Sequence, residues 1–258
     1  MTDPVSSSGR VSLDGPDVLP VLRIGRRWLS EVRPGSATAA SVATFIRDRF
    51  RVAYGAEPAL RIPGLLALTS GEGRLMAAVG ARNAGRERLF LEDYLVVPVE
   101  QQMPEPGVPR HRIAEIAHLA GVEAGVSRHL FTALALWLDA ARYDWVVCTG
   151  TGQLRNSVHR LGIETPVLGP ADPLRLPDGG ADWGRYYDHR PVVMAIHVGR
   201  TLEALGHLGL TRRALFLGRP ELTLGALSGT GSDAGRSDLA AGGSGDSGEC
   251  GERYGITA

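Results

Sequence analysis

The chain has 258 residues, a length that suits one domain with tails or at most two small domains. Of these residues 43% are hydrophobic and 22% charged, which is the balance of a globular protein and not of a disordered or collagen-like one. Acidic and basic side chains number 28 each, so net charge favours neither nucleic acid nor an anionic membrane as a partner. Every basic residue is arginine. The absence of lysine excludes Schiff-base catalysis and a phosphate-binding loop built on lysine.

Cysteine, histidine and hydropathy patterns exclude further classes. Cys148 lies in an apolar run and Cys250 in a polar segment, so the two predict neither a disulfide framework nor a thiolate metal site. The seven histidines lack the spacings of metal-binding motifs, and we expect no metal. No window approaches the roughly 20 apolar residues of a spanning helix, and residues 1–20 carry no export signal. We therefore expect a cytoplasmic protein with no membrane span.

Composition divides the chain into three parts. Residues 1–20 are rich in Ser, Pro, Asp and Gly without periodicity, and we expect them to form a disordered leader. Residues 226–258 are rich in Gly and Ser, so they cannot bury enough apolar surface to offset chain entropy and predict a disordered tail. The sequence therefore predicts a single folded domain at residues 21–225.

The first half of this domain predicts a helix followed by a hairpin. Ala39–Tyr54 has apolar residues at helical spacing. Two apolar runs, Leu65–Thr69 and Leu75–Ala81, flank a Ser-Gly-Glu-Gly turn and predict paired strands. Leu89–Val99 is apolar but interrupted by two acids and a proline, which indicates a strand leading into an irregular stretch.

The second half predicts alternating strands and helices. Arg112–Ala120 alternates as a strand, and Ser127 is a suitable N-cap for a helix that continues to about Arg142. Gly162 is suited to end a short helix in the left-handed conformation. The other expected elements are strands at Trp145–Thr149 and Val192–Val198 and helices at 154–161 and Thr201–Leu217. This order indicates an α/β (α+β) fold with one mixed sheet.

Six segments carry a resemblance to a known family. They are RVAYGAEPAL (51–60), AAVGAR (77–82), LFLEDYL with PVE (89–100), RIAEIAHLA (112–120), WVVCTGTGQLRNSVHRLGI (145–163) and WGRYYDHRPVV (183–193). In this order they resemble the GNAT acyltransferase superfamily and, more closely, the thermostable hemolysin family. The chain departs from the family at Val96, where the family usually has an aspartate.

The resemblance implies a single-domain GNAT-like fold akin to that of the acyl-homoserine-lactone synthases. Those enzymes transfer an acyl group from a carrier thioester to a small amine. The implied activity is therefore transfer from acyl-CoA or an acyl carrier protein, as cosubstrate, to a small-molecule amine acceptor. The family name comes instead from a lytic phenotype, and two alternatives stay open: a membrane-active hemolysin acting through Thr201–Leu217, and a catalytically inactive GNAT-like scaffold.

Glu115 is the candidate catalytic residue. It lies in the middle of an expected strand between apolar neighbours, where burial raises the pKa of a carboxyl group toward that of a useful general base. The acyl-homoserine-lactone synthases carry a similarly placed strand glutamate. The alternative is a structural ion pair with an arginine, and the candidates are Arg82, Arg110 and Arg112.

The resemblance also implies where the donor binds. GNAT proteins hold the donor's phosphate groups on backbone N–H groups between a strand and a helix, which here points to Gly121, Gly125, Ser127 and Arg128. Asn156 matches the asparagine that contacts the pantetheine arm in the superfamily. An ordinary capped loop and a solvent-facing asparagine are the alternatives.

Acidic and aromatic residues suggest the acceptor side. Glu92, Asp93 and Glu100 could orient a cationic amine, although such charges are more often solvated. We expect His118 to be a packed strand residue. Aromatic residues that could wall a pocket or belong to the core are Trp183, Tyr186 and Tyr187.

Overall fold

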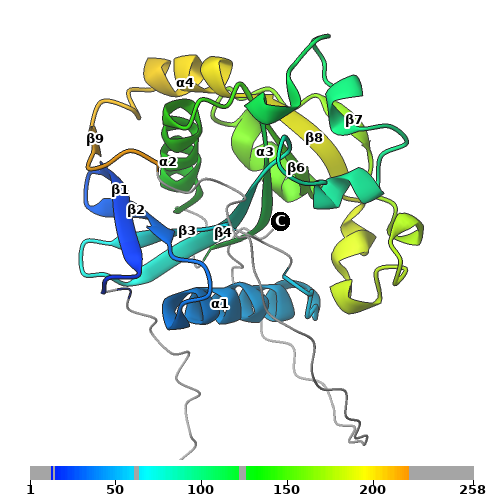
Figure 1. Ribbon diagram of the computed structural model, residues 1–258, viewed down its shortest axis with the longest axis horizontal. Coiled ribbons are helices and arrows are strands. Elements are labelled where there is room, and N and C mark those ends of the chain that lie inside the picture. The colour runs from blue at the N-terminus through cyan, green and yellow to red at the C-terminus, as the bar shows by residue number, and fades with distance from the viewer. Residues whose placement is uncertain (1–12, 14, 61–63, 122–125, 221–258) are drawn as a thin grey trace, which may run out of the picture.

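The computed structural model describes residues 13, 15–60, 64–121 and 126–220. Within these residues the chain forms one sheet of nine strands in the order β7-β8-β6-β5-β4-β3-β2-β1-β9 (Figure 1). The strands are β1 (Val18–Ile24), β2 (Arg27–Val32), β3 (Gly64–Ser70), β4 (Leu75–Asn83), β5 (Ile113–Gly121), β6 (Trp145–Gly150), β7 (Val167–Pro170), β8 (Val192–His197) and β9 (Ala214–Phe216). The α-helices are α1 (Ala37–Tyr54), α2 (Val126–Ala140), α3 (Gly152–His159) and α4 (Val198–His207). The mixed α/β sheet expected from the sequence is confirmed.

Helix α1 shows why the sequence predicted this part well. Its N-cap Ser36 accepts a hydrogen bond from the Ala39 N–H, and Gly55 ends it in the left-handed conformation at φ 64°. Buried residues recur every four positions along the face that packs on the sheet. In sequence order they are Val42, Ile46, Phe50 and Tyr54.

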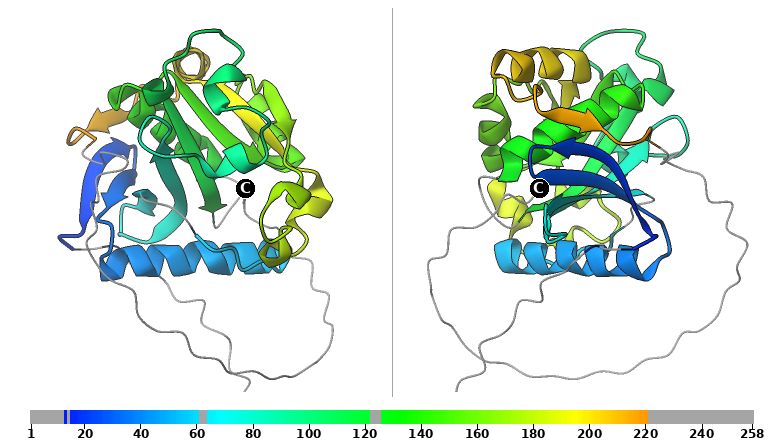
Figure 2. Two further views of the ribbon diagram at one scale, coloured as in Figure 1. Left: turned by 45° about the vertical axis from the view of Figure 1, so that its right-hand side comes forward. Right: turned by 90° about the vertical axis from the view of Figure 1, so that its left-hand side faces the viewer.

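Two apolar layers cover the two faces of the sheet. Helix α1 and the segment between β7 and β8 pack on one face, and α2 and α4 pack against each other on the other (Figures 1 and 2). Strand β5 contributes to both layers because alternate side chains of a strand point to opposite faces. Ala114 and Ile116 belong to the α2 layer, whereas Ile113 belongs to the α1 layer.

The β5 and β6 strands form a parallel pair that separates partway along. Their register covers only Ile113↔Trp145, Ala114↔Val146 and Glu115↔Val147, although β5 continues to Gly121 and β6 to Gly150. The other strand pairs of the described sheet are antiparallel. Side chains beyond Glu115 and Val147 therefore line a wedge that backbone hydrogen bonds do not close.

Four expectations about local structure were wrong. Leu89–Val99 is not a strand, because it forms short 3₁₀ helices at Phe90–Asp93 and Val99–Gln101. Ser127 is not an N-cap, since α2 already begins at Val126. Thr201–Leu217 is not one helix. It divides into α4, a turn with Gly209 at φ 69°, and β9, which pairs with β1 (Figure 2).

The fourth wrong expectation concerns where the folded part of the chain begins. Strand β1 begins at Val18, so the end of the expected leader belongs to the sheet, and the side chain of Leu13 is buried in the α1 layer. The sequence also missed β2, because the alternating pattern of Arg27–Val32 is short. The expected tail, residues 226–258, lies outside the described residues. No described helix is both long and apolar enough to cross a bilayer.

Candidate functional site

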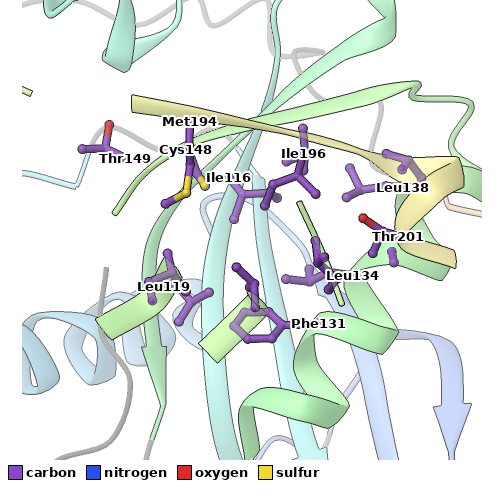
Figure 3. A pocket seen from close by; sticks show the side chains of 16 residues that line it. Ile116, Leu119, Phe131, Leu134, Leu138, Cys148, Thr149, Met194, Ile196 and Thr201 are labelled. Atoms are coloured by element: carbon purple, nitrogen blue, oxygen red, sulfur yellow. The ribbon is translucent and has the colours of Figure 1, made fainter. Parts of the chain in front are cut away.

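An apolar cavity of about 70 Å³ lies where β5 and β6 separate, between the sheet and helices α2, α3 and α4 (Figure 3). Ile116 and Leu119 of β5, Phe131 and Leu134 of α2, and Met194 of β8 point toward its centre. The side chains that line the cavity are apolar except for Thr149, Thr201 and the thiol of Cys148. A cavity of this kind favours a hydrocarbon chain over a polar ligand.

A second, smaller cavity of about 20 Å³ lies in the wedge on the opposite, α1-facing side of the sheet. We call it the amine chamber. Its lining consists of Phe90, Tyr94, Glu115, Ala117, His118, Thr149, Trp183 and Tyr186. This volume is enough for one water-sized polar group. Thr149 lines both cavities, and its Oγ1 has no hydrogen-bond partner among the described residues.

Glu115 is the only carboxylate among the residues that line the chamber. Its two oxygens accept hydrogen bonds from the backbone N–H groups of Phe90 (3.0 Å) and Leu91 (2.9 Å), at the start of the first 3₁₀ helix. Arg82 on the neighbouring strand lies 3.8 Å away. Burial raises the pKa of Glu115, and the charge of Arg82 and the two N–H groups only partly oppose it. The residue is therefore both ion-paired and placed to accept a proton.

The other two arginines considered as partners of Glu115 bind elsewhere. Arg110 pairs with Glu92 and Glu100, and Arg112 forms two hydrogen bonds with Asp144, at 2.6 and 2.8 Å. Of the three candidates, the ion pair is with Arg82.

The acids expected to bind the acceptor hold the 3₁₀ loop in place. Glu92 accepts hydrogen bonds from the N–H groups of Leu89 (2.8 Å) and Val99 (3.0 Å) and from both terminal nitrogens of Arg110 (2.6 and 2.7 Å). Burial opposes its ionisation, but Arg110 and the two N–H groups outweigh burial and lower the pKa of Glu92.

The remaining two acids make ion pairs of their own. Asp93 pairs with Arg88, and Glu100 pairs with Arg110. Glu92, Asp93 and Glu100 are therefore near the chamber in sequence but absent from its lining. They stay predictions as acceptor ligands.

The residues expected to bind the donor lie at one end of the sheet. Gly121 is the last residue of β5, Ser127 and the exposed Arg128 lie in the first turn of α2, and Gly125 is outside the described residues. Asn156 lies in the middle of α3 on its exposed side, not at its start. The strand-loop-helix order that suggested a donor site is present, and donor binding itself stays a prediction.

Sequence reasoning did not select two residues that the fold brings together with Glu115. His118 was expected only to pack, and Thr149 was not considered. The signal for Thr149 would have been a lone hydroxyl at the end of a buried strand. Of the aromatic residues considered as pocket walls, Trp183 and Tyr186 line the chamber, while Tyr187 donates to or accepts from Tyr94 at 2.6 Å.

Gly184 holds this aromatic segment against α1. At φ 49° it lies in a region that favours glycine, and an added Cβ would lie 2.3 Å from the Tyr54 carbonyl oxygen. We expect Gly184→Ala to lower the free energy of unfolding by roughly 2–4 kcal/mol, because neither backbone can move aside cheaply. The matched control is Gly179→Ala, at φ 62° with no heavy atom within 4 Å of the added Cβ, which should cost roughly 1–2 kcal/mol. Equal losses in urea unfolding would contradict the close approach.

The comparison with protein families decides the identification. The thermostable hemolysin family profile matches residues 32–202, which include most of the sheet, helices α1, α2 and α3, and the first half of α4. The chain belongs to the thermostable hemolysin family. No curated protein matches the sequence at a significant level.

Solved structures similar to this thermostable hemolysin family member are distant in sequence. TofI in an apo form is 15% identical, with 69% of this chain and 95% of that chain covered and a TM-score of 0.47. The AHL synthase LasI is 14% identical, with 72% of this chain and 95% of that chain covered and a TM-score of 0.47. FeeM, an N-acyl amino acid synthase from uncultured soil microbes, is 16% identical, with 74% of this chain and 97% of that chain covered and a TM-score of 0.47. At this level of sequence and structural similarity, these structures are likenesses only.

Proposed function

We propose that this protein is a GNAT-like acyltransferase that moves an acyl group from a thioester donor, acyl-CoA or an acyl carrier protein, to a small amine. One observation carries the proposal: an apolar cavity and a chamber containing a buried carboxylate share the lining residue Thr149, in the gap between two separating parallel strands. The apolar cavity suits the acyl chain. The chamber suits the attacking amine.

The reaction needs no covalent enzyme intermediate. The amine nitrogen attacks the thioester carbonyl carbon, the new C–N bond forms, and the C–S bond breaks to release a thiolate. Glu115 accepts the proton that the amine loses, and that proton then goes to the departing thiolate, so protons balance. The Thr149 hydroxyl is placed to donate a hydrogen bond to the carbonyl oxygen, where negative charge develops.

The donor's remaining length is proposed to leave the wedge toward the start of α2. There Ser127, Arg128 and the backbone N–H groups of the first turn are suited to phosphate, and Asn156 on α3 is a candidate contact for the pantetheine arm. A nucleophilic role for Cys148 is disfavoured, because burial raises its pKa to about 12.

The lytic alternative has less support in the folded chain. The segment proposed to enter a membrane is divided between α4, whose buried residues Val198, Thr201 and Leu205 pack inward, and β9 at the sheet edge. Lysis caused by a lipid-like product stays compatible with acyl transfer.

The direct test is release of free thiol from acyl-CoA of increasing chain length in the presence of a panel of small primary amines, with mass spectrometry of the product. Amine-dependent thiol release with an amide product is expected. An inactive scaffold would give neither, for any donor, including acyl groups on a carrier protein.

Filling the apolar cavity should change donor preference. Ala135 lines the cavity from α2 and is 4% exposed, so Ala135→Leu places a larger side chain where the acyl chain is proposed to lie. We expect kcat/KM for long-chain donors to fall by about 10-fold or more, since about 1–3 kcal/mol of binding free energy between acyl chain and pocket is lost. The kcat/KM for acetyl or butyryl donors should change little. Ala140→Leu, on the same helix and outside the cavity, is the control. An unchanged chain-length profile in Ala135→Leu would place the acyl chain elsewhere.

A further inference from the structure

His118 lies on the amine-chamber side of the sheet because of a β-bulge. The register between β4 and β5 shifts between the pairs Ala78↔Ala120 and Gly80↔Ala117, and His118 has φ 52°. Regular alternation after Ala117 would turn residue 118 toward α2. Instead Leu119 lines the apolar cavity, and His118 lines the chamber together with Glu115 and Ala117.

The imidazole is held rigidly by aromatic rings. It stacks on Trp183, with ring centroids 5.7 Å apart and an interplanar angle of 13°. The ring centroids of Phe50 and Phe90 lie 6.0 and 6.3 Å from that of the imidazole. A buried side chain in the left-handed region is unfavourable by about 1–2 kcal/mol, and such backbone strain concentrates at functional sites.

One nitrogen of the imidazole lacks the partner that a buried polar group normally has. His118 is 5% exposed, and its Nδ1 has no hydrogen-bond partner among the described residues. Burial, with a smaller contribution from the charge of Arg82, lowers the pKa of His118 to about 3. The ring is therefore neutral near pH 7, and one of its nitrogens can accept a hydrogen bond.

We propose that His118 is an acceptor-binding residue whose imidazole accepts a hydrogen bond from the primary amine of the acyl acceptor, beside the Glu115 carboxylate. This inference rests on the proposed acyl transfer and names the chemistry of the acceptor group. Two hydrogen-bond acceptors, Glu115 and His118, face one water-sized space walled by Phe90 and Trp183. A primary ammonium or amine fits that lining, because it offers several N–H donors and its charge is attracted to aromatic faces.

The geometry further favours an unbranched amine. The chamber is small, about 20 Å³, so we expect primary amines to be preferred over secondary amines and quaternary ammonium groups. Proton transfer remains with Glu115, and His118 orients the nitrogen toward the thioester carbon at Thr149.

Binding is tested first without turnover. In protein labelled with ¹⁵N-histidine, the His118 ring signals, assigned by their loss in His118→Asn, are followed during titration with methylammonium chloride. We expect a saturable shift of those signals with methylammonium and none with tetramethylammonium, which has no N–H to donate. No shift with methylammonium, or equal shifts with both ions, would overturn the proposal.

Kinetics then separate this inference from the proposed function. His118→Phe keeps the aromatic stack and removes both ring nitrogens. The KM for the amine should therefore rise roughly 10- to 150-fold, the range for one lost hydrogen bond to a charged donor, with the KM for acyl-CoA unchanged. His118→Asn supplies a polar side chain that tolerates positive φ and should restore most of the amine affinity. If wild type acylates no amine, the proposed function fails. If His118→Phe keeps the wild-type KM for the amine while transfer proceeds, only this inference fails.

Discussion

Replacing Glu115 by glutamine should reduce kcat by roughly 10²–10⁴-fold while acyl-CoA binding persists, because the amide cannot accept the amine proton. The wild-type rate should rise with pH through the raised pKa of Glu115, since only the carboxylate form is a base, and the variant should lack this rise. Steady-state kinetics across pH measure kcat and its pH dependence, and calorimetric titration with acyl-CoA measures donor binding.

Stability measurements test the raised pKa of Glu115 independently of activity. A carboxyl group whose folded pKa is raised contributes stability that is complete below its unfolded pKa and is lost as pH rises through the folded pKa. Urea unfolding of wild type should show this loss, and Glu115→Gln should not.

The matched control is Glu31→Gln. Glu31 is also a buried strand glutamate, 1% exposed, but it accepts from the indole N–H of Trp137 at 2.8 Å and lines neither cavity. Its kcat should stay near wild type. A fully active Glu115→Gln would remove Glu115 from the mechanism, and an inactive variant that is also unfolded would leave only the structural role.

Replacing Glu92 by alanine should lower the free energy of unfolding by about 3 kcal/mol. The change leaves the N–H groups of Leu89 and Val99 without their acceptor and takes the main counter-charge from Arg110. We place the loss at the lower end of the range for a broken buried pair, because the Arg110 side chain is 28% exposed and keeps Glu100.

The contribution of Glu92 to the free energy of unfolding changes with pH in the opposite direction to that of Glu115. The pKa of Glu92 is lowered in the folded protein, so its contribution is present above the unfolded pKa and is lost as pH falls through the folded pKa. The difference between wild type and Glu92→Ala in urea unfolding should therefore shrink on acidification. Glu105→Ala is the control, because the Glu105 pair with Arg200 is exposed and should contribute at most about 1 kcal/mol. A loss for Glu92→Ala as small as this control would show that the loop does not depend on Glu92.

Local signals in the sequence were sufficient for the regular elements. Helix α1 and the β3–β4 hairpin carry their periodicity, cap and turn within a short stretch, so they were predicted closely. The loop after Leu89 was mistaken for a strand because its conformation depends on two residues about 20 positions away. Glu115 accepts hydrogen bonds from backbone N–H groups of the loop, and Arg110 donates hydrogen bonds to Glu92 in the loop. No window of sequence contains those contacts.

The sequence by itself determined the mixed α/β class, the family, and Glu115 as a buried strand acid, because these depend on composition, periodicity and motif order. Only the tertiary structure decided that Arg82 is its ion-pair partner, that the acids at 92, 93 and 100 support the loop, and that the chamber includes His118 and Thr149. The physical reason is that a one-residue bulge and a three-pair parallel register decide which way side chains on β5 and β6 point. Such register depends on pairing between strands far apart in the chain, which local sequence does not encode.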